Sequence, residues 1–300
     1  MTLMSSLPIA PSELIINPDG SIFHLHILPE ELADTVILVG DPGRVKLVAS
    51  FFEEGSIRVD KSSREFRTVT GRYNGREVSV ISTGIGTDNI DIVVTELDAL
   101  ANIDFNTKCV RPDHKRLTLL RIGTCGAVQP DIPLGSYVFS EYSIGFDGLL
   151  NWYAGCSEVA DAAMEAAFVQ HMNWPKRLPA PYFIKSAERL ISLFEKNSVM
   201  GMTISAPGFY GPQGRSVRLP LTFDDLIGNL ESFRYYDRRV TNIEMESSAL
   251  SGLSALLGHD AGTICLVIAN RYAKESRPDY HLLMKGLVQL ALDTLTGTSI

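Results

Sequence analysis

Short runs rich in β-branched residues alternate with longer helical patterns along almost the whole chain, and this alternation constrains the fold more than any other feature. Alternating strands and helices are typical of an α/β domain in which helices cover both faces of a sheet. We therefore predict an α/β fold, and a chain of 300 residues would fit one large domain or two small ones.

The alternation also places the individual elements. Strands are predicted at Thr35–Gly40, Val78–Thr83, Leu117–Gly123, Tyr137–Glu141, Gly201–Ser205 and Thr263–Ala269. Helices are predicted at Arg44–Phe52, Ile90–Ala101, Ala187–Lys196, Glu244–Leu257 and His281–Thr296. Several strands end in glycine or small polar residues just before a helix begins. Ligands of open α/β sheets bind at the carboxyl ends of strands, so functional residues are expected there.

Charge and composition exclude several classes of partner. The formal net charge of −8 argues against nucleic acid, because binding it needs a basic face. A few arginines in a pocket could still bind a small anion, since each charge-assisted hydrogen bond contributes roughly 1.5–3 kcal/mol. No apolar run approaches the roughly 18 residues of a membrane span, and the first residues lack the pattern of a signal peptide. The cysteines form no C-x-x-C pair, so we expect reduced thiols in a cytoplasmic protein.

Two of the strand ends carry residues suited to an anion. In Gly40–Arg44 (Gly-Asp-Pro-Gly-Arg), glycines let the backbone approach an oxyanion, and the arginine offers phosphate a rigid fork. A tight turn with a surface arginine explains this motif equally well. Arg121 stands in an otherwise apolar strand and needs an anionic partner if it is buried. That partner could be a protein carboxylate, but Thr124 and the neighbouring glycine amides favour bound phosphate.

The glycines of Ser82–Asn89 suggest a dinucleotide-binding motif, but the pattern fails that test. Asn89 stands where the third glycine of G-x-G-x-x-G should be, and no acidic residue is placed convincingly for a ribose. We therefore expect a turn that approaches a small polar ligand closely.

Two later segments could hold the rest of a ligand. Phe209, Gln213 and Arg215 share one loop, where they could stack on a planar heterocycle and bind its polar edge. A surface loop without a ligand is the simpler interpretation of that loop alone. Glu244 and Glu246 stand in the first turn of a predicted core helix, whose dipole accounts for one carboxylate. The other needs a donor, which ribose hydroxyls would supply.

Together these motifs resemble the nucleoside phosphorylase family, and its uridine phosphorylase branch most closely. Six motifs match in order and spacing: Gly40–Arg44, Ser63–Phe66, Ser82–Gly86, Arg121–Ala127, Gln213–Arg215 and Glu244–Ser247. The resemblance runs from about Ser21 to the C-terminal helix. It implies a single three-layer α/β domain, residues 21–300, with a twisted, mixed central β-sheet flanked by helices, after an N-terminal extension, residues 1–20. It implies cleavage of an N-glycosidic bond by inorganic phosphate, which is a co-substrate, and no other cofactor.

The resemblance implies a role for each matching residue. Phosphate would be bound by Gly40, Arg44, Arg121 and Thr124, together with Arg64 of the partner subunit. Ribose would be bound by Met245, Glu246 and His24 of the partner subunit, and the base by Phe209, Gln213, Arg215, Asn270 and Arg271. The catalytic residues would be Arg121, Glu246 and Arg215. Such shared sites imply a homodimer, or a hexamer of three dimers.

Asn270 bears on the choice of base. Asn270 directly follows the strand predicted at Thr263–Ala269. The purine branch of the family has an aspartic acid near the end of this strand, which protonates the purine ring. A neutral amide cannot act as a general acid, whereas uracil can leave as an anion held by Arg215, with Arg271 near its carbonyl. We therefore favour uridine. A purine phosphorylase or nucleosidase of the same fold, and a non-catalytic nucleoside-binding protein, remain alternatives.

Three positions depart from the family pattern. Cys125 replaces a threonine or serine and removes a strong hydroxyl donor near phosphate or sugar, and Gly214 replaces a larger residue. Some relatives bind a monovalent cation at the dimer interface. Glu65 and Ile85 match that site but Asn89 does not, so no metal is predicted.

Overall fold

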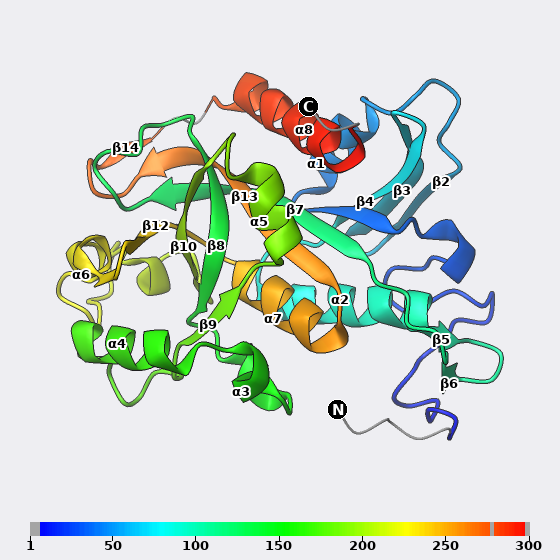
Figure 1. Ribbon diagram of the computed structural model, residues 1–300, viewed down its shortest axis with the longest axis horizontal. Helices are drawn as coiled ribbons and strands as arrows, with labels where there is room; N and C mark the ends of the chain where they lie inside the picture. Colours follow the sequence, from blue (N-terminus) through cyan, green and yellow to red (C-terminus); the bar gives the residue numbers. More distant parts are fainter. Residues whose placement is uncertain (1–6, 277–278, 298–300) are drawn as a thin grey trace.

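The computed structural model describes residues 7–276 and 279–297, and a twelve-stranded mixed sheet runs through its centre (Figure 1). The strands are β1 (Thr35–Val39), β2 (Val59–Ser63), β3 (Phe66–Tyr73), β4 (Arg76–Ser82), β5 (Ile103–Asp104), β6 (Cys109–Val110), β7 (Thr118–Ala127), β8 (Tyr137–Gly145), β9 (Tyr182–Lys185), β10 (Val199–Ser205), β11 (Arg234–Tyr235), β12 (Arg238–Glu244), β13 (Asp260–Asn270) and β14 (Glu275–Ser276). The α-helices are α1 (Pro42–Ala49), α2 (Thr87–Asn102), α3 (Cys156–Val159), α4 (Ala162–Met172), α5 (Glu188–Phe194), α6 (Leu226–Ser232), α7 (Ser247–Leu257) and α8 (His281–Thr296).

The order of the strands closes part of the sheet into a ring. The main path is β11-β12-β10-β8-β13-β7-β1-β4-β3-β2, and β12 also pairs with β7. Strands β7, β13, β8, β10 and β12 therefore form a closed barrel, from which β1 to β4 extend as an open sheet. In the closing pair, Ile243 lies opposite Gly126, so the carboxyl ends of β12 and β7 meet.

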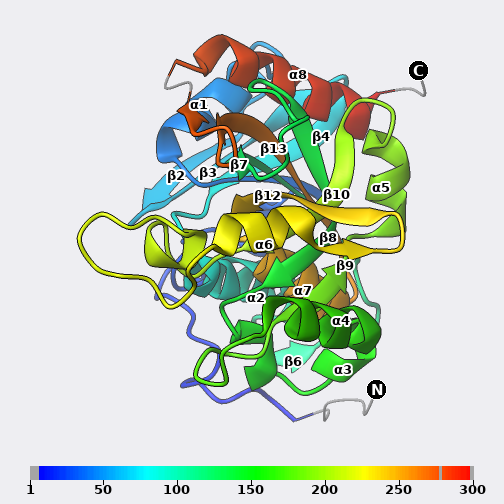
Figure 2. The same ribbon diagram turned by 90° about the vertical axis from the view of Figure 1, so that its left-hand side faces the viewer.

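Helices cover both faces of the sheet. Helices α1, α5 and α8 pack on one face, where their apolar side chains share a core cluster with β1, β4 and β13. Helices α2 and α7 contact each other on the opposite face, below the sheet in Figure 1. Helices α4 and α6 pack beside the barrel around a third apolar cluster (Figure 2). The predicted three-layer α/β fold is therefore confirmed.

Local sequence explains the elements that lead into the sheet's carboxyl edge. The apolar run of β1 is buried from Val36 to Val39. Helix α1 then begins with Pro42 in its first turn, while the Asp41 carboxylate accepts a hydrogen bond from the Gly43 N–H. Proline and an acidic N-cap are both favoured at a helix start. The predicted strand, turn and helix around Gly40 are therefore present.

Other predicted boundaries are wrong. Helix α7 begins at Ser247, not Glu244, because Arg238–Glu244 form β12 and Glu246 is the N-cap. Strand β7 continues to Ala127, because it pairs with β13 and then β12 beyond Gly123. Thr124 and the glycine amides beside it are therefore part of a strand rather than a turn at the strand exit. The predicted helix bounds His281–Thr296 agree with α8.

Among the described residues, no helix combines the length and apolar character that crossing a membrane requires. The expected N-terminal extension is described from residue 7, so its first six residues lie outside the described residues, as do 277–278 and 298–300 of the expected domain. Leu14 is buried in the α2 and α7 core cluster, and Ile9 packs against it.

Candidate active site

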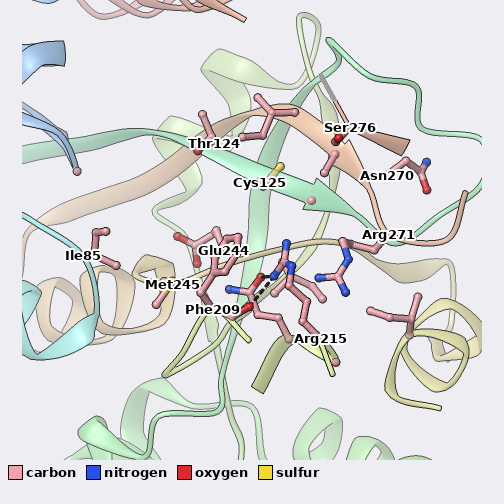
Figure 3. A pocket seen from close by; sticks show the side chains of 18 of the residues that line it. Ile85, Thr124, Cys125, Phe209, Arg215, Glu244, Met245, Asn270, Arg271 and Ser276 are labelled. Carbon is pink, nitrogen blue, oxygen red and sulfur yellow. Dashed lines mark hydrogen bonds between the residues drawn. The ribbon is translucent and has the colours of Figure 1, made fainter. Parts of the chain in front are cut away.

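One cavity of about 1340 Å³ lies where the carboxyl ends of β1, β4, β7, β12 and β13 converge (Figure 3). Eleven residues predicted from the sequence line it: Gly40, Arg44, Arg121, Thr124, Phe209, Gln213, Arg215, Met245, Glu246, Asn270 and Arg271. They come from segments up to about 230 residues apart in the chain, so the fold alone brings them together. Their polar groups divide into a carboxylate and guanidinium cluster near Gly40 and a second cationic group around Arg215.

Arg121 is the centre of the first cluster. Its side chain is buried and forms ion pairs with Glu244, at 3.2 Å, and with Glu246. The alternative of a protein carboxylate as the partner of Arg121 is therefore present in the structure. Gly123 makes room for this side chain, because a Cβ at that position would lie 2.2 Å from Arg121 Nη1. A glycine two residues after a strand arginine thus allows the guanidinium to lie along the strand.

Glu244 and Glu246 differ in the acceptor capacity that they have left. Glu244 accepts hydrogen bonds from the Glu246 N–H, the Ser247 N–H and the Ser247 hydroxyl, in addition to its ion pair with Arg121. The Glu244 carboxylate therefore caps the first backbone N–H groups of α7, although Glu246 occupies the N-cap position. Glu246 accepts from Arg121 through one oxygen and from the Gly86 N–H, at 2.8 Å, through the other. A carboxylate has about four acceptor positions, so Glu246 retains acceptors for a ligand.

Burial raises the pKa of the Glu246 carboxyl, and the charge of Glu244 adds to this, whereas Arg121 opposes it. The glycine turn predicted at Gly84–Gly86 contributes directly here, because Gly86 adopts φ +100° and donates its N–H to Glu246. Gly84 and Ile85 line the cavity beside it.

Arg44 forms no ion pair with a carboxylate in the part of the chain that the structure describes. Its Nη1 donates to the Ile122 carbonyl at 3.2 Å, and no carboxylate of the described residues lies within 4.0 Å of it. Burial lowers the pKa of Arg44, and the nearby positive charge of Arg121 lowers it further. An anion placed between Arg44 and Arg121 would relieve both effects.

Aromatic, amide and guanidinium groups are in contact in the loop between β10 and α6, residues 206–225, which is called the base loop because the sequence predicts that it binds the base. Arg215 lies over the Phe209 ring, with its Cζ 3.9 Å from the centroid, and donates to Gln213 Oε1 at 2.6 Å. Burial lowers the pKa of Arg215 to about 10, and repulsion by Arg271 contributes. Figure 3 shows Arg271 directed toward the same space as Arg215. Gly126 makes room for Arg271, because a Cβ there would lie 3.0 Å from its Cγ.

Asn270 requires a correction. Its Nδ2 donates to the carbonyls of Gln129 and Ile132, and its Oδ1 accepts from the N–H groups of Tyr272 and Ala273. These four bonds use the hydrogen-bonding groups of the amide, and the side chain is directed away from the cavity in Figure 3. Asn270 therefore shapes the turn after β13, and the geometry gives no support to a contact between its amide and the base.

His24 and Arg64 lie outside the cavity lining of their own chain. The Glu96 carboxylate accepts from the backbone N–H groups of His24 and Leu25, and from His24 Nδ1 at 2.6 Å. Arg64 lies over the Phe23 ring, 5.4 Å from its centroid. Phe23 also packs against the His24 ring, with centroids 4.7 Å apart, so His24 and Arg64 lie on either side of one aromatic side chain.

The structure also contains a separate group of possible metal ligands. One oxygen or nitrogen atom from each of its residues lies within 4.8 Å of those of the others: Asp98, His114 and His259. The Leu117 N–H donates to His259 Nδ1, so the ring proton is on Nε2, which faces Asp98. His114 Nε2 likewise donates to the Leu257 carbonyl. A metal-bound imidazole nitrogen must be deprotonated, so the proton on His259 Nε2 indicates a hydrogen bond to Asp98 rather than a bond from His259 to a metal.

Several residues that line the cavity belong to no motif recognised in the sequence. These residues come from the β10–α6 loop, the start of α6 and the β13–β14 hairpin: Ser216, Ile227, Tyr272, Lys274 and Ser276. Cys125 also lines it, and burial raises the pKa of its thiol well above the usual range. Cys125 therefore contributes a neutral thiol to the cavity wall.

This fold and cavity define a class of α/β enzymes in which strand ends bring anion-binding guanidinium groups beside a carboxylate with free acceptors. The chain belongs to the phosphorylase superfamily, which it matches over residues 34–292. This confirms the family resemblance seen in the sequence.

Three relatives indicate how similar the chain is to known members. A uridine phosphorylase of Thermococcus kodakarensis is 31% identical over 260 residues, covering 86% of this chain and 80% of the relative. A DeoD-type purine nucleoside phosphorylase of Myxococcus xanthus is 29% identical over 243 residues, covering 76% and 95%. The crystal structure of a Trypanosoma brucei nucleoside phosphorylase, described as showing uridine phosphorylase activity, superposes with a TM-score of 0.88 at 30% identity, covering 95% of this chain and 100% of that one.

Proposed function

We propose that this protein is a uridine phosphorylase, a pentosyltransferase that converts uridine and inorganic phosphate into uracil and ribose 1-phosphate. The observation that carries the proposal is that one cavity combines the uncompensated charge of Arg44, the free acceptors of Glu246 and the Gln213–Arg215 pair. The uridine phosphorylase names of its relatives support the choice of substrate.

In this mechanism phosphate is the nucleophile, so the protein provides placement and charge stabilisation. Arg44 and Arg121 hold the phosphate, and Thr124 lies in the same wall of the cavity. Glu246 accepts hydrogen bonds from the ribose hydroxyls and fixes the anomeric carbon above the phosphate. As the N-glycosidic bond breaks, its electron pair leaves with uracil, and phosphate oxygen forms the new bond to the anomeric carbon.

The departing uracil carries negative charge, and the base loop is suited to that charge. Desolvation and Arg271 disfavour the charged form of Arg215 when no ligand is bound, which an anionic base would reverse. Gln213 Oε1 is held by Arg215, which orients the amide toward a planar heterocycle. We propose that phosphate is the co-substrate and that no further cofactor is used.

A phosphorolysis panel tests the proposal. Uridine, thymidine, inosine and adenosine are assayed with and without phosphate, and release of the base is measured. We expect uridine turnover only with phosphate. Cleavage of inosine without that of uridine would favour the purine activity named for the Myxococcus relative, and cleavage in phosphate-free buffer would indicate a nucleosidase. Ligand binding without base release would indicate a binding protein.

Arg215→Ala should lower kcat/KM for uridine about 10-fold and reduce its preference over inosine, because the variant loses a charge-assisted bond in a partly solvated site. Arg218→Ala is a matched control, since this exposed arginine belongs to the same loop. Competition between uridine and inosine in one reaction measures the preference directly. An unchanged ratio of the two products would contradict a role for Arg215 in base selection.

We also propose that active sites are shared between subunits of a homodimer or hexamer in the cytoplasm, with neither nucleic acid nor membrane as a partner. In such a shared site His24 of the partner subunit would bind the 5′-hydroxyl of the ribose. His24→Ala should then lower kcat/KM for uridine about 10-fold, the loss of one hydrogen bond, and leave kcat/KM for 5′-deoxyuridine unchanged. His26→Asn is the control, because His26 has φ +55°, a conformation that asparagine tolerates. Equal losses with both nucleosides would contradict the proposed contact with the 5′-hydroxyl.

A further inference from the structure

Behind the base loop lies a second cavity of about 870 Å³, lined mainly by apolar, aromatic and proline side chains. The loop between β10 and α6 forms the wall between the two cavities and projects from the body of the molecule (Figure 2). Phe209 and Gln213 line the first cavity, Tyr210 and Pro212 line the second, and Arg215 lines both.

The floor of the second cavity is preformed. The Trp174 ring packs against Phe146, with centroids 4.7 Å apart, and against Phe223, at 5.5 Å. Trp174 Nε1 donates to the Pro179 carbonyl at 2.9 Å, which fixes the indole. Proline walls restrict the backbone further, so a ligand would meet an ordered aromatic surface at little cost in conformational entropy.

The rim of this cavity leaves large apolar side chains in water. Val217 is 80% exposed, Leu219 75% and Tyr210 60%. Single exposed apolar residues are common on protein surfaces, but these three lie together at the edge of one apolar cavity. Such a continuous apolar surface is typical of a ligand-binding site.

The charge of the mouth selects the kind of ligand. Arg215 and Arg218 line the cavity, and neither forms an ion pair within the described part of the chain. The acidic residue of the lining, Asp147, already accepts hydrogen bonds from the Leu149 N–H, the Tyr182 hydroxyl and the Ser248 hydroxyl. With two arginines and one aspartate, the lining carries a net positive charge above an aromatic floor, which complements a flat apolar molecule bearing an anionic group.

We propose that this second cavity binds a small aromatic anion at a site distinct from the nucleoside site. Because Arg215 lines both cavities, an anion that draws its guanidinium toward the second cavity weakens binding of the base in the first. This coupling rests on the proposed function, whereas binding in the second cavity does not.

The test uses the full chain and the fluorescent probe 8-anilinonaphthalene-1-sulfonate, with N-phenyl-1-naphthylamine as its uncharged counterpart. Trp152 is 87% exposed, so Trp152→Phe leaves Trp174, in the cavity floor, as the sole tryptophan whose quenching reports occupancy. We expect one anionic probe bound per chain, with binding of the neutral probe at least 5-fold weaker. Uracil and phosphate at saturation should weaken binding of the anionic probe without abolishing it.

Exposed positions provide variants that should fold. Leu219→Ser and Arg218→Ala should each weaken binding of the anionic probe at least 5-fold, whereas Leu282→Ser, at an 85% exposed leucine of α8, should not. Complete displacement of the probe by uracil and phosphate, equal binding of both probes, or indifference to Leu219→Ser would each overturn the second site. Retained probe binding in a protein that fails the phosphorolysis panel would contradict the proposed function and leave this site standing.

Discussion

Arg44→Ala is expected to lower kcat/KM for phosphate by about 100- to 1000-fold while leaving the melting temperature unchanged or raising it. The two effects have opposite signs for one reason. Arg44 is partly buried beside Arg121 without a carboxylate partner among the described residues, so its charge destabilises the empty protein and is available to phosphate. Removing it relieves the repulsion and removes the ligand contact together.

Arg121→Ala provides the contrast. Arg121 neutralises both Glu244 and Glu246, so its loss leaves two buried carboxylates uncompensated and should destabilise the fold by about 3–5 kcal/mol. Steady-state kinetics at varied phosphate and thermal unfolding separate the two arginines. A large loss of stability in Arg44→Ala, or normal use of phosphate, would show that Arg44 serves the fold rather than the anion.

The features that the sequence predicts correctly are those set by nearby residues. Gly40, Pro42 and Arg44 lie in one strand, turn and helix, and their pattern is local. The α8 helix is likewise defined by its own apolar repeat. In the turn and the two helices the hydrogen bonds connect neighbours in the chain, and the buried apolar run of β1 indicates a strand even though its partners β4 and β7 are distant.

The features that the sequence does not predict depend on distant segments. Strand β12 pairs with β7, more than 100 residues earlier, and this pairing turns the expected first helical turn at Glu244 into the end of a strand. The Asn270 amide donates to the carbonyls of Gln129 and Ile132, which lie 138 residues or more earlier in the chain. Residue types identified these positions as polar and buried, but their partners follow from barrel closure.

Arg121 illustrates the same limit within the site. Its position in an apolar strand requires an anion, and both a carboxylate and a phosphate satisfy that requirement from sequence alone. The structure places Glu244 and Glu246 against Arg121, whereas Arg44 donates to a backbone carbonyl. In the proposed mechanism Arg121 would therefore link the carboxylates to the phosphate, and Arg44 would provide the free charge.

Glu246→Gln is expected to lower kcat/KM for uridine by about 100-fold at neutral pH, since ribose hydroxyls would donate to a neutral amide oxygen instead of a carboxylate. The side chain keeps its size, and Glu244 continues to cap α7 and pair with Arg121, so the fold should persist. Circular dichroism verifies the fold, and Glu231→Gln, at a glutamate of α6 outside the cavity lining, serves as the control.

The pH dependence of this variant tests the carboxylate itself. Burial raises the pKa of Glu246, so the carboxylate that accepts from ribose is present at high pH and is lost as pH falls, beginning above the usual range for glutamate. The ratio of wild-type to Glu246→Gln activity should therefore decrease as the pH is lowered. Taking this ratio cancels the titration of phosphate, which affects both proteins equally. A ratio independent of pH would mean that the charge of Glu246 does not act on the ribose, and its pairing with Arg121 would then be its principal role.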